Sequence, residues 1–128
     1  MTERSEAYKR GEQVRRQLLG DEYFEKSMAD PVMRKFTEVT VETLWSVLWT
    51  RPGLDMRTKT LICVVSDAAT GRHPELKNHI KLALNHGWTQ DELLDVFVHL
   101  YGYVGAPLTR EAFLIAKEVF ETGDRTIG

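Results

Sequence analysis

Apolar residues recur at helical spacing over most of the chain. Residues from about 5 to 19 follow this spacing, and Gly20 is expected to end the first helix. The stretch EYFEKSMADP that follows is expected to be irregular or a short helical turn. A second helix is predicted from about Pro31 through Trp49, because a proline is tolerated in the first turn of a helix.

The turn formed by Pro52 and Gly53 separates these helices from a second group. The spacing predicts four further helices, at about residues 56–70, 74–87, 89–103 and 108–121. Asp55 is expected to cap the first of the four. Thr89 and Glu92 have the spacing of a capping box, which predicts the start of the third.

The first helix of this second group, residues 56–70, is apolar on nearly every side. Such a helix is typical of the centre of a fold or of a subunit interface. No part of the chain shows the alternation of apolar and polar positions that half-buried strands require. The sequence therefore predicts an all-α helical bundle, and its length fits a single domain over residues 1–128.

Composition and charge narrow the classes of function. The chain of 128 residues is 42% hydrophobic and 28% charged, which is ordinary for a globular protein. Its net charge of -2 and its scattered lysines and arginines argue against nucleic-acid binding. No apolar run approaches the roughly 20 residues that span a bilayer, and the charged N-terminus lacks the apolar core of a signal peptide. We therefore expect a cytoplasmic protein with no membrane or nucleic-acid partner.

A single cysteine, Cys63, limits thiol and metal chemistry. It cannot form an internal disulfide, and it excludes a CxxC redox centre or a cysteine zinc site within one chain. Its apolar surroundings favour a small buried side chain. His79 and His86 are seven residues apart, whereas metal-binding pairs on helices favour closer spacings, so we expect no metal site.

Four stretches taken together resemble the carboxymuconolactone decarboxylase family: VRRQLLGDEYFEKS, LWTRPGLDMRTKTLI, ELKNHIKLALNHGWTQDELLDVF and YVGAPLTREAFLIAKEVF. They follow the order and spacing of the family and cover nearly the whole chain. The resemblance implies an all-helical fold of the alkyl hydroperoxidase D-like type, assembled as a trimer or hexamer. It also implies a carboxy-lyase that decarboxylates a small carboxylated lactone or related ring acid from aromatic compound breakdown, with no metal or organic cofactor.

A related branch, the alkyl hydroperoxidase D-like proteins, uses a CxxC pair followed by a histidine, with a glutamate upstream. His79 falls where that histidine falls. Arg72 and Glu75 occupy the two cysteine positions, and Thr60 occupies the glutamate position. A thiol peroxidase needs a thiolate and usually a second thiol beside it, so the sequence argues against that activity.

Two departures from the family pattern leave an alternative open. Val47 stands where decarboxylases of the family typically carry a glutamate, shortly before WTRPGL. Leu108, Thr109 and Arg110 stand where the family commonly has small residues and asparagine. The alternative function is a non-catalytic, oligomeric member of the family that binds a small molecule.

His79 is the leading candidate for a catalytic residue. An imidazole can donate or accept a proton near neutral pH. Loss of carbon dioxide leaves an electron pair on carbon, so a donor must hold the developing oxyanion and an acid must protonate the carbon. Glu75, one helical turn earlier, could orient the ring or could form a solvated surface ion pair. The structural alternative for His79 is a hydrogen-bonded histidine at the edge of the core.

Trp45 and Trp49 are four residues apart and therefore share a helix face, with Glu42 three residues before the first of them. Two indole rings and a carboxylate could form one wall of a substrate pocket. Aromatic residues at helical spacing are also typical of a core. Glu42 lies one turn from the position taken by Val47, so it could replace the missing carboxylate.

Three further residues could bind a substrate. Arg51, which matches the family motif, and Arg110, which does not, could clamp a carboxylate, although either could equally be a surface side chain. Tyr103 matches a tyrosine of the family, and its hydroxyl could face the pocket or its ring could pack in the core.

Overall fold

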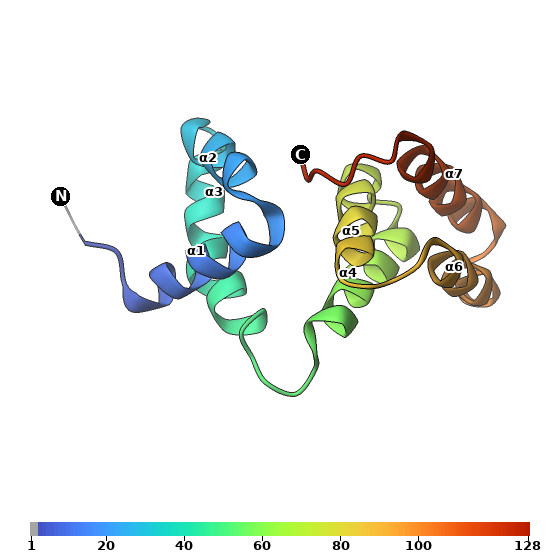
Figure 1. Cartoon of the computed structure of the whole chain (residues 1–128), viewed down its shortest axis with the longest axis horizontal. Coiled ribbons are helices and arrows are strands. Elements are labelled where there is room, and N and C mark those ends of the chain that lie inside the picture. Colours follow the sequence, from blue (N-terminus) through green and yellow to red (C-terminus); the bar gives the residue numbers. More distant parts are fainter. Residues whose placement is uncertain (1–2) are drawn as a thin grey trace. The chain divides into compact units, whose positions relative to one another are not determined.

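Helices make up the regular structure of residues 3–128, the part of the chain that the computed structural model describes (Figure 1). This confirms the predicted all-α fold. No helix in the described part is long and apolar enough to cross a bilayer. The elements in chain order are α1 (Glu6–Leu19), α2 (Asp21–Ala29), α3 (Met33–Thr40), the π-helix η1 (Val41–Leu48), α4 (Met56–Thr70), α5 (His73–Asn85), α6 (Gln90–Val104) and α7 (Ala106–Thr122).

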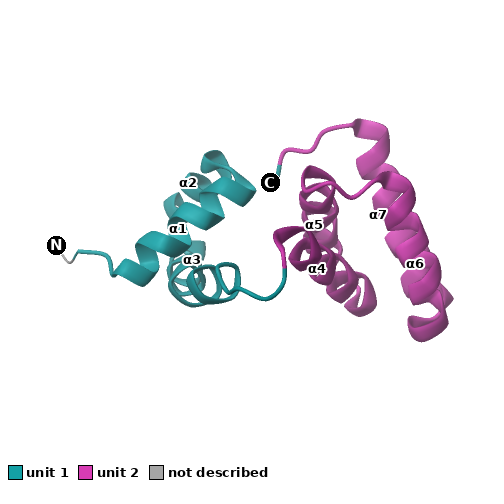
Figure 2. Ribbon diagram, turned by 60° about the horizontal axis from the view of Figure 1, so that its bottom comes forward, with its two compact units in different colours: residues 1–54, 127–128 teal, residues 55–126 magenta. Residues whose placement is uncertain are grey.

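The helices form two compact units (Figure 2). Unit 1 holds the residues up to Leu54 together with Ile127–Gly128, and its helices are α1, α2, α3 and η1. Unit 2 holds Asp55–Thr126, with α4 packed against α5, α6 and α7. The single domain expected over the whole chain stays a prediction.

Side-chain caps set the helix starts that the sequence predicts. The backbone N–H of Thr58 donates to Asp55 at 2.7 Å, which satisfies one of the unpaired donors at the start of α4. At the start of α6, the N–H of Glu92 donates to the Thr89 hydroxyl at 3.0 Å. The N–H of Thr89 donates to the Glu92 carboxylate at 2.9 Å. The predicted cap and capping box are both confirmed.

The stretch EYFEKSMADP is more regular than expected, because most of it belongs to the nine-residue helix α2. Phe24 anchors this helix as a buried side chain. The guanidinium of Arg16, on α1, lies 4.2 Å from the centre of the Phe24 ring and forms ion pairs with Asp21 and Glu25. These contacts across the Gly20 turn stabilise α2 in a way that spacing within the stretch does not reveal.

The helix predicted from Pro31 to Trp49 changes its winding partway along. It begins as α3 and continues as η1, in which hydrogen bonds run from residue i to i+5. The Trp49 N–H, for example, donates to the Leu44 carbonyl at 3.3 Å. Over two turns, apolar spacing does not distinguish the two windings.

Gly11 lets α1 approach η1 closely. A Cβ atom at this position would overlap the carbonyl oxygen of Val41 and lie 3.0 Å from the backbone nitrogen of Ser46. Both obstacles are backbone atoms, so neither can rotate away. The packing of the two helices therefore requires a residue without a side chain at this position.

The helix α4 buries one face rather than all sides, in contrast to the even apolar pattern of its sequence. Its buried residues are Thr60, Val64, Asp67 and Ala68. Ile62 on the opposite side is exposed. The core of unit 2 consists of Val64, Ala68, Leu76, Ile80, Ala83, Leu84, Leu93, Phe97, Ala112, Ala116 and Val119.

We expect Gly11→Ala to lower the free energy of unfolding by about 2 kcal/mol or more, because overpacking against backbone outweighs the higher helix propensity of alanine. Gly102→Ala is the matched control. Gly102 lies within α6 with no atom near its added Cβ, so this change should raise stability by up to about 1 kcal/mol. Urea unfolding followed by circular dichroism measures both variants. A Gly11→Ala protein as stable as the parent would contradict the close approach.

Candidate functional site

His79 lies at the edge of the core face of α5. Its neighbour Ile80 is completely buried, together with Leu76 and Ala83 on the same helix. The His79 side chain keeps 24% of its surface exposed. It is therefore neither sealed in the core nor fully solvated.

The imidazole of His79 contacts a carboxylate that the sequence analysis did not single out. Its Nδ1 atom pairs with Oδ2 of Asp67, which lies on α4, the helix that packs against α5. The Asp67 side chain is only 6% exposed. A buried carboxylate needs a partner to offset its desolvation, and the imidazole is that partner.

The spacing along α4 could have identified Asp67. Val64 and Ala68 are buried, and Asp67 shares their face of the helix. An acidic residue in the middle of an apolar run, on the side that turns to the core, indicates a specific polar partner. Because the residues of α4 around Asp67 are nearly all apolar, the sequence alone did not distinguish the face on which Asp67 lies.

Glu75, the residue considered for orienting the ring, is exposed to solvent. The imidazole contacts Asp67 instead.

The histidines at the two ends of α5, His73 in its first turn and His86 at its C-cap, have contacts of their own. His73 pairs with Glu111 on α7, and Nδ1 of His86 lies 2.9 Å from the carbonyl oxygen of Leu82. No group of three or more potential metal ligands occurs among residues 3–128.

Cys63 lies on α4 one turn before Asp67 and is half-buried. Burial, together with the nearby negative charge of Asp67, raises the pKa of its thiol to about 11. The thiol is therefore protonated at neutral pH and is a poor nucleophile.

Four of the predicted site residues belong to unit 1. Trp45 and Trp49 are buried and stacked, with ring centres 5.1 Å apart and planes at 16°. This arrangement fits the alternative of a packed aromatic pair. Glu42 is exposed and accepts a hydrogen bond from the Ser5 hydroxyl at 2.9 Å. It borders a hollow of about 350 Å³. Arg51 is exposed in the turn after η1.

Two further candidates belong to unit 2, as His79 does. Tyr103 is 80% exposed, and its ring centre lies 5.6 Å from that of His99. Its side chain is therefore not part of the core.

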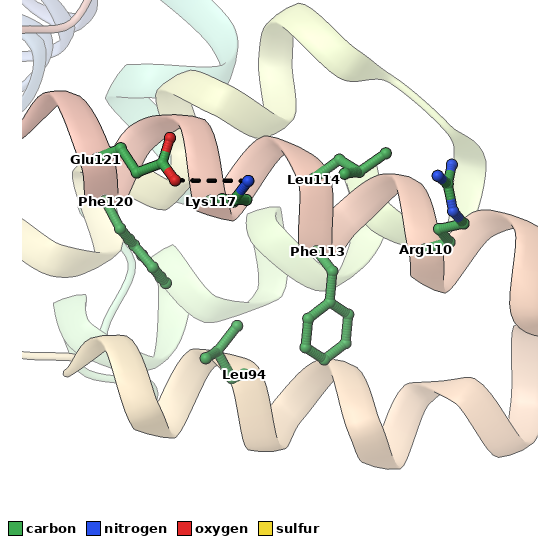
Figure 3. Close-up of a pocket in the computed structure, with 7 residues that line it drawn as sticks. All are labelled: Leu94, Arg110, Phe113, Leu114, Lys117, Phe120 and Glu121. Atoms are coloured by element: carbon green, nitrogen blue, oxygen red, sulfur yellow. Dashed lines mark ion pairs between the residues drawn. The ribbon is translucent and has the colours of Figure 1, made fainter.

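Arg110 borders an apolar hollow of about 340 Å³ between α6 and α7. Figure 3 shows Phe113 and Phe120 pointing from α7 toward α6, where Leu94 points back at them, while the Arg110 guanidinium points away from α6. His79 does not line this hollow. The structure thus pairs His79 with Asp67 rather than with the arginine.

Comparison with known proteins gives concordant matches. The family model described as "Carboxymuconolactone decarboxylase family" matches residues 34–118. The 4-carboxymuconolactone decarboxylase of Acinetobacter baylyi is 33% identical over 116 residues, covering 89% of this chain and 87% of that protein. Nitrosuccinic acid decarboxylase npaB of Metarhizium robertsii is 32% identical over 110 residues, covering 84% of this chain and 77% of that protein. These matches confirm the resemblance: the chain belongs to the carboxymuconolactone decarboxylase family.

Proposed function

We propose that this protein is a cofactor-free decarboxylase acting on a small carboxylated lactone or a related acid, with His79 as its proton donor. The observation that carries the proposal is the partly exposed imidazole held by the buried carboxylate of Asp67. Its family and the names of two relatives support the reaction class.

The chemistry needs one well-placed acid. The bond between the carboxylate carbon and the substrate breaks, carbon dioxide leaves, and the electron pair stays on the substrate carbon. A neighbouring electron-withdrawing group takes up that charge as an oxyanion. A protonated imidazole then delivers its proton to the carbon.

The names of the two relatives indicate which feature of the substrate matters. One relative is named for a carboxylated lactone and the other for a nitro-substituted diacid. Both kinds of molecule combine a carboxylate with a group that withdraws electrons. We therefore infer a small acid of this type for the present chain.

Each unit, taken by itself, also offers candidate substrate contacts, which form the second level of the proposal. Arg51 and Arg110 are exposed guanidinium groups, suited to a carboxylate. Trp45 and Trp49 would supply an apolar wall, and Tyr103 an exposed hydroxyl. Glu42 would serve as the carboxylate in place of the residue lost at Val47.

The proposal predicts turnover of γ-carboxymuconolactone or a related acid, and a loss of kcat of about a hundredfold or more in His79→Gln. The matched control is His86→Gln, which changes another partly buried histidine, at the C-cap of the same helix, and should leave kcat unchanged. Release of carbon dioxide from a panel of carboxylated lactones and nitro acids measures the rates.

Equal rates for His79→Gln and the parent would refute the role of His79. Binding of these acids in a thermal-shift assay without any product would favour the alternative, a non-catalytic small-molecule-binding member of the family.

Self-association as a trimer or hexamer is the second part of the proposal. A row of apolar side chains on α3, η1 and the turn before them is exposed to solvent, with Phe36 at 64%. Exposed apolar surface of this kind marks an interface in many proteins. The row consists of Val32, Met33, Phe36, Val39, Leu44, Val47 and Leu48.

Phe36→Glu should shift the molar mass in solution toward the single chain, because a charge would be buried in the interface. Gln13→Glu adds the same charge on α1, at an exposed position among polar side chains, and should not change the mass. Size-exclusion chromatography with light scattering measures both. A parent protein that elutes as a single chain would exclude the assembly.

The proposal also predicts that the chain does not reduce hydroperoxides. Because the pKa of Cys63 is raised, its thiolate should appear only as the pH approaches 11. Alkylation by iodoacetamide should therefore be slow at neutral pH and accelerate with rising pH. In urea the thiol of the unfolded chain has an ordinary pKa of about 8.5. The unfolded chain should therefore react faster than the folded one at each pH below about 11. Mass spectrometry follows the reaction. Equal rates for folded and unfolded chains at neutral pH would contradict the shielding of the thiol.

A further inference from the structure

We propose that Asp67 is a positioning residue: its carboxylate holds Nδ1 of His79 and thereby makes Nε2 the nitrogen that delivers the proton. This inference rests on the proposed decarboxylation and specifies which atom of the ring performs it. Asp67 does not touch the substrate in this account, and it acts only through the imidazole.

The hydrogen bond between Asp67 and His79 determines which ring nitrogen carries a hydrogen. An ionised carboxylate has no proton to donate, so it can only accept a hydrogen bond. The contact between Asp67 Oδ2 and His79 Nδ1 therefore requires a hydrogen on Nδ1. This holds for the neutral ring and for the protonated ring. The proton that the ring gains and loses consequently belongs to Nε2.

The side chains of Asp67 and His79 differ in exposure to solvent. Asp67, at 6% exposed, lies on the same buried face of α4 as Val64 and Ala68. The imidazole, at 24%, is the member of the pair that a small molecule can reach. The burial of the carboxylate thus separates the group that orients from the group that reacts.

The imidazole is the group that pairs with the Asp67 carboxylate, and the nearby thiol of Cys63 does not replace it. Cys63, the other titratable side chain on this part of α4, carries a protonated thiol at neutral pH. The side chain that Asp67 contacts is the imidazole of His79. The imidazole is therefore the group that offsets the buried charge. When His79 is protonated, the same carboxylate stabilises the imidazolium that must form before proton delivery.

A structural ion pair between α4 and α5 would give the same contact without a role in the reaction. The two accounts differ in what Asp67→Asn should do. The asparagine keeps the shape and loses the charge, and its amide can donate to Nδ1 as well as accept. Under our proposal the ring then loses its fixed tautomer. Under the structural account the tautomer can change as well, so the accounts are separated by kcat, which falls under our proposal and stays that of the parent under the structural account.

The experiment combines two measurements on the full chain labelled with ¹⁵N-histidine. Nitrogen NMR without substrate, at a pH where the ring is neutral, should find the hydrogen of His79 on Nδ1 in the parent protein. It should move wholly or partly to Nε2 in Asp67→Asn. Decarboxylation kinetics should show a fall in kcat of about a hundredfold or more, with a much smaller change in KM. Asp95→Asn, an exposed aspartate on α6, is the matched control and should alter neither measurement.

Each result decides the inference. A parent protein with the hydrogen on Nε2 overturns it directly, and this measurement requires no variant to fold. An unchanged tautomer, or an unchanged kcat, in Asp67→Asn also overturns it. If the parent decarboxylates none of the acids, the proposed function fails. A tautomer shift in Asp67→Asn would then still support the assignment of Asp67 as the residue that holds the ring.

Discussion

The contact between the Asp67 carboxylate and the Nδ1 atom of His79 ties a polar pair to the packing of unit 2. It joins α4 to α5 at the edge of the core, where one partner is buried and the other is partly exposed. A carboxylate at this depth is tolerated only because the imidazole pairs with it. The pair also fixes the orientation of the imidazole, because its Nδ1 atom is engaged by the carboxylate.

The starts of α4 and α6 were the most predictable part of the fold. Asp55, Thr89 and Glu92 are local signals, since each acts on backbone groups three residues away. The start of α2 was not predictable in this way. Phe24 and Glu25 are held by Arg16 from the preceding helix, so the contacts that stabilise α2 depend on how the chain folds back on itself.

The candidate site was predicted only in part, for a similar reason. His79 could be identified because its residue type is rare on an apolar stripe and because the resemblance to the alkyl hydroperoxidase D-like branch implies a histidine there. Asp67 is twelve residues earlier on a different helix, and pairing the two requires the packing of α4 on α5. Trp45 and Trp49 illustrate the opposite case. Their spacing correctly predicts that the two rings share a helix face, yet the stacked, buried rings fit a core as well as a pocket wall.

The unusual winding of η1 has a consequence for how a family like this one can vary. In an α-helix, residues five apart point to different sides, but in a helix bonded from i to i+5 they follow each other one turn apart. Glu42 and Val47 stand in that relation, and both are exposed. An acidic group could therefore be exchanged between these two positions during evolution while staying on the same side of the helix, with no rearrangement of the backbone.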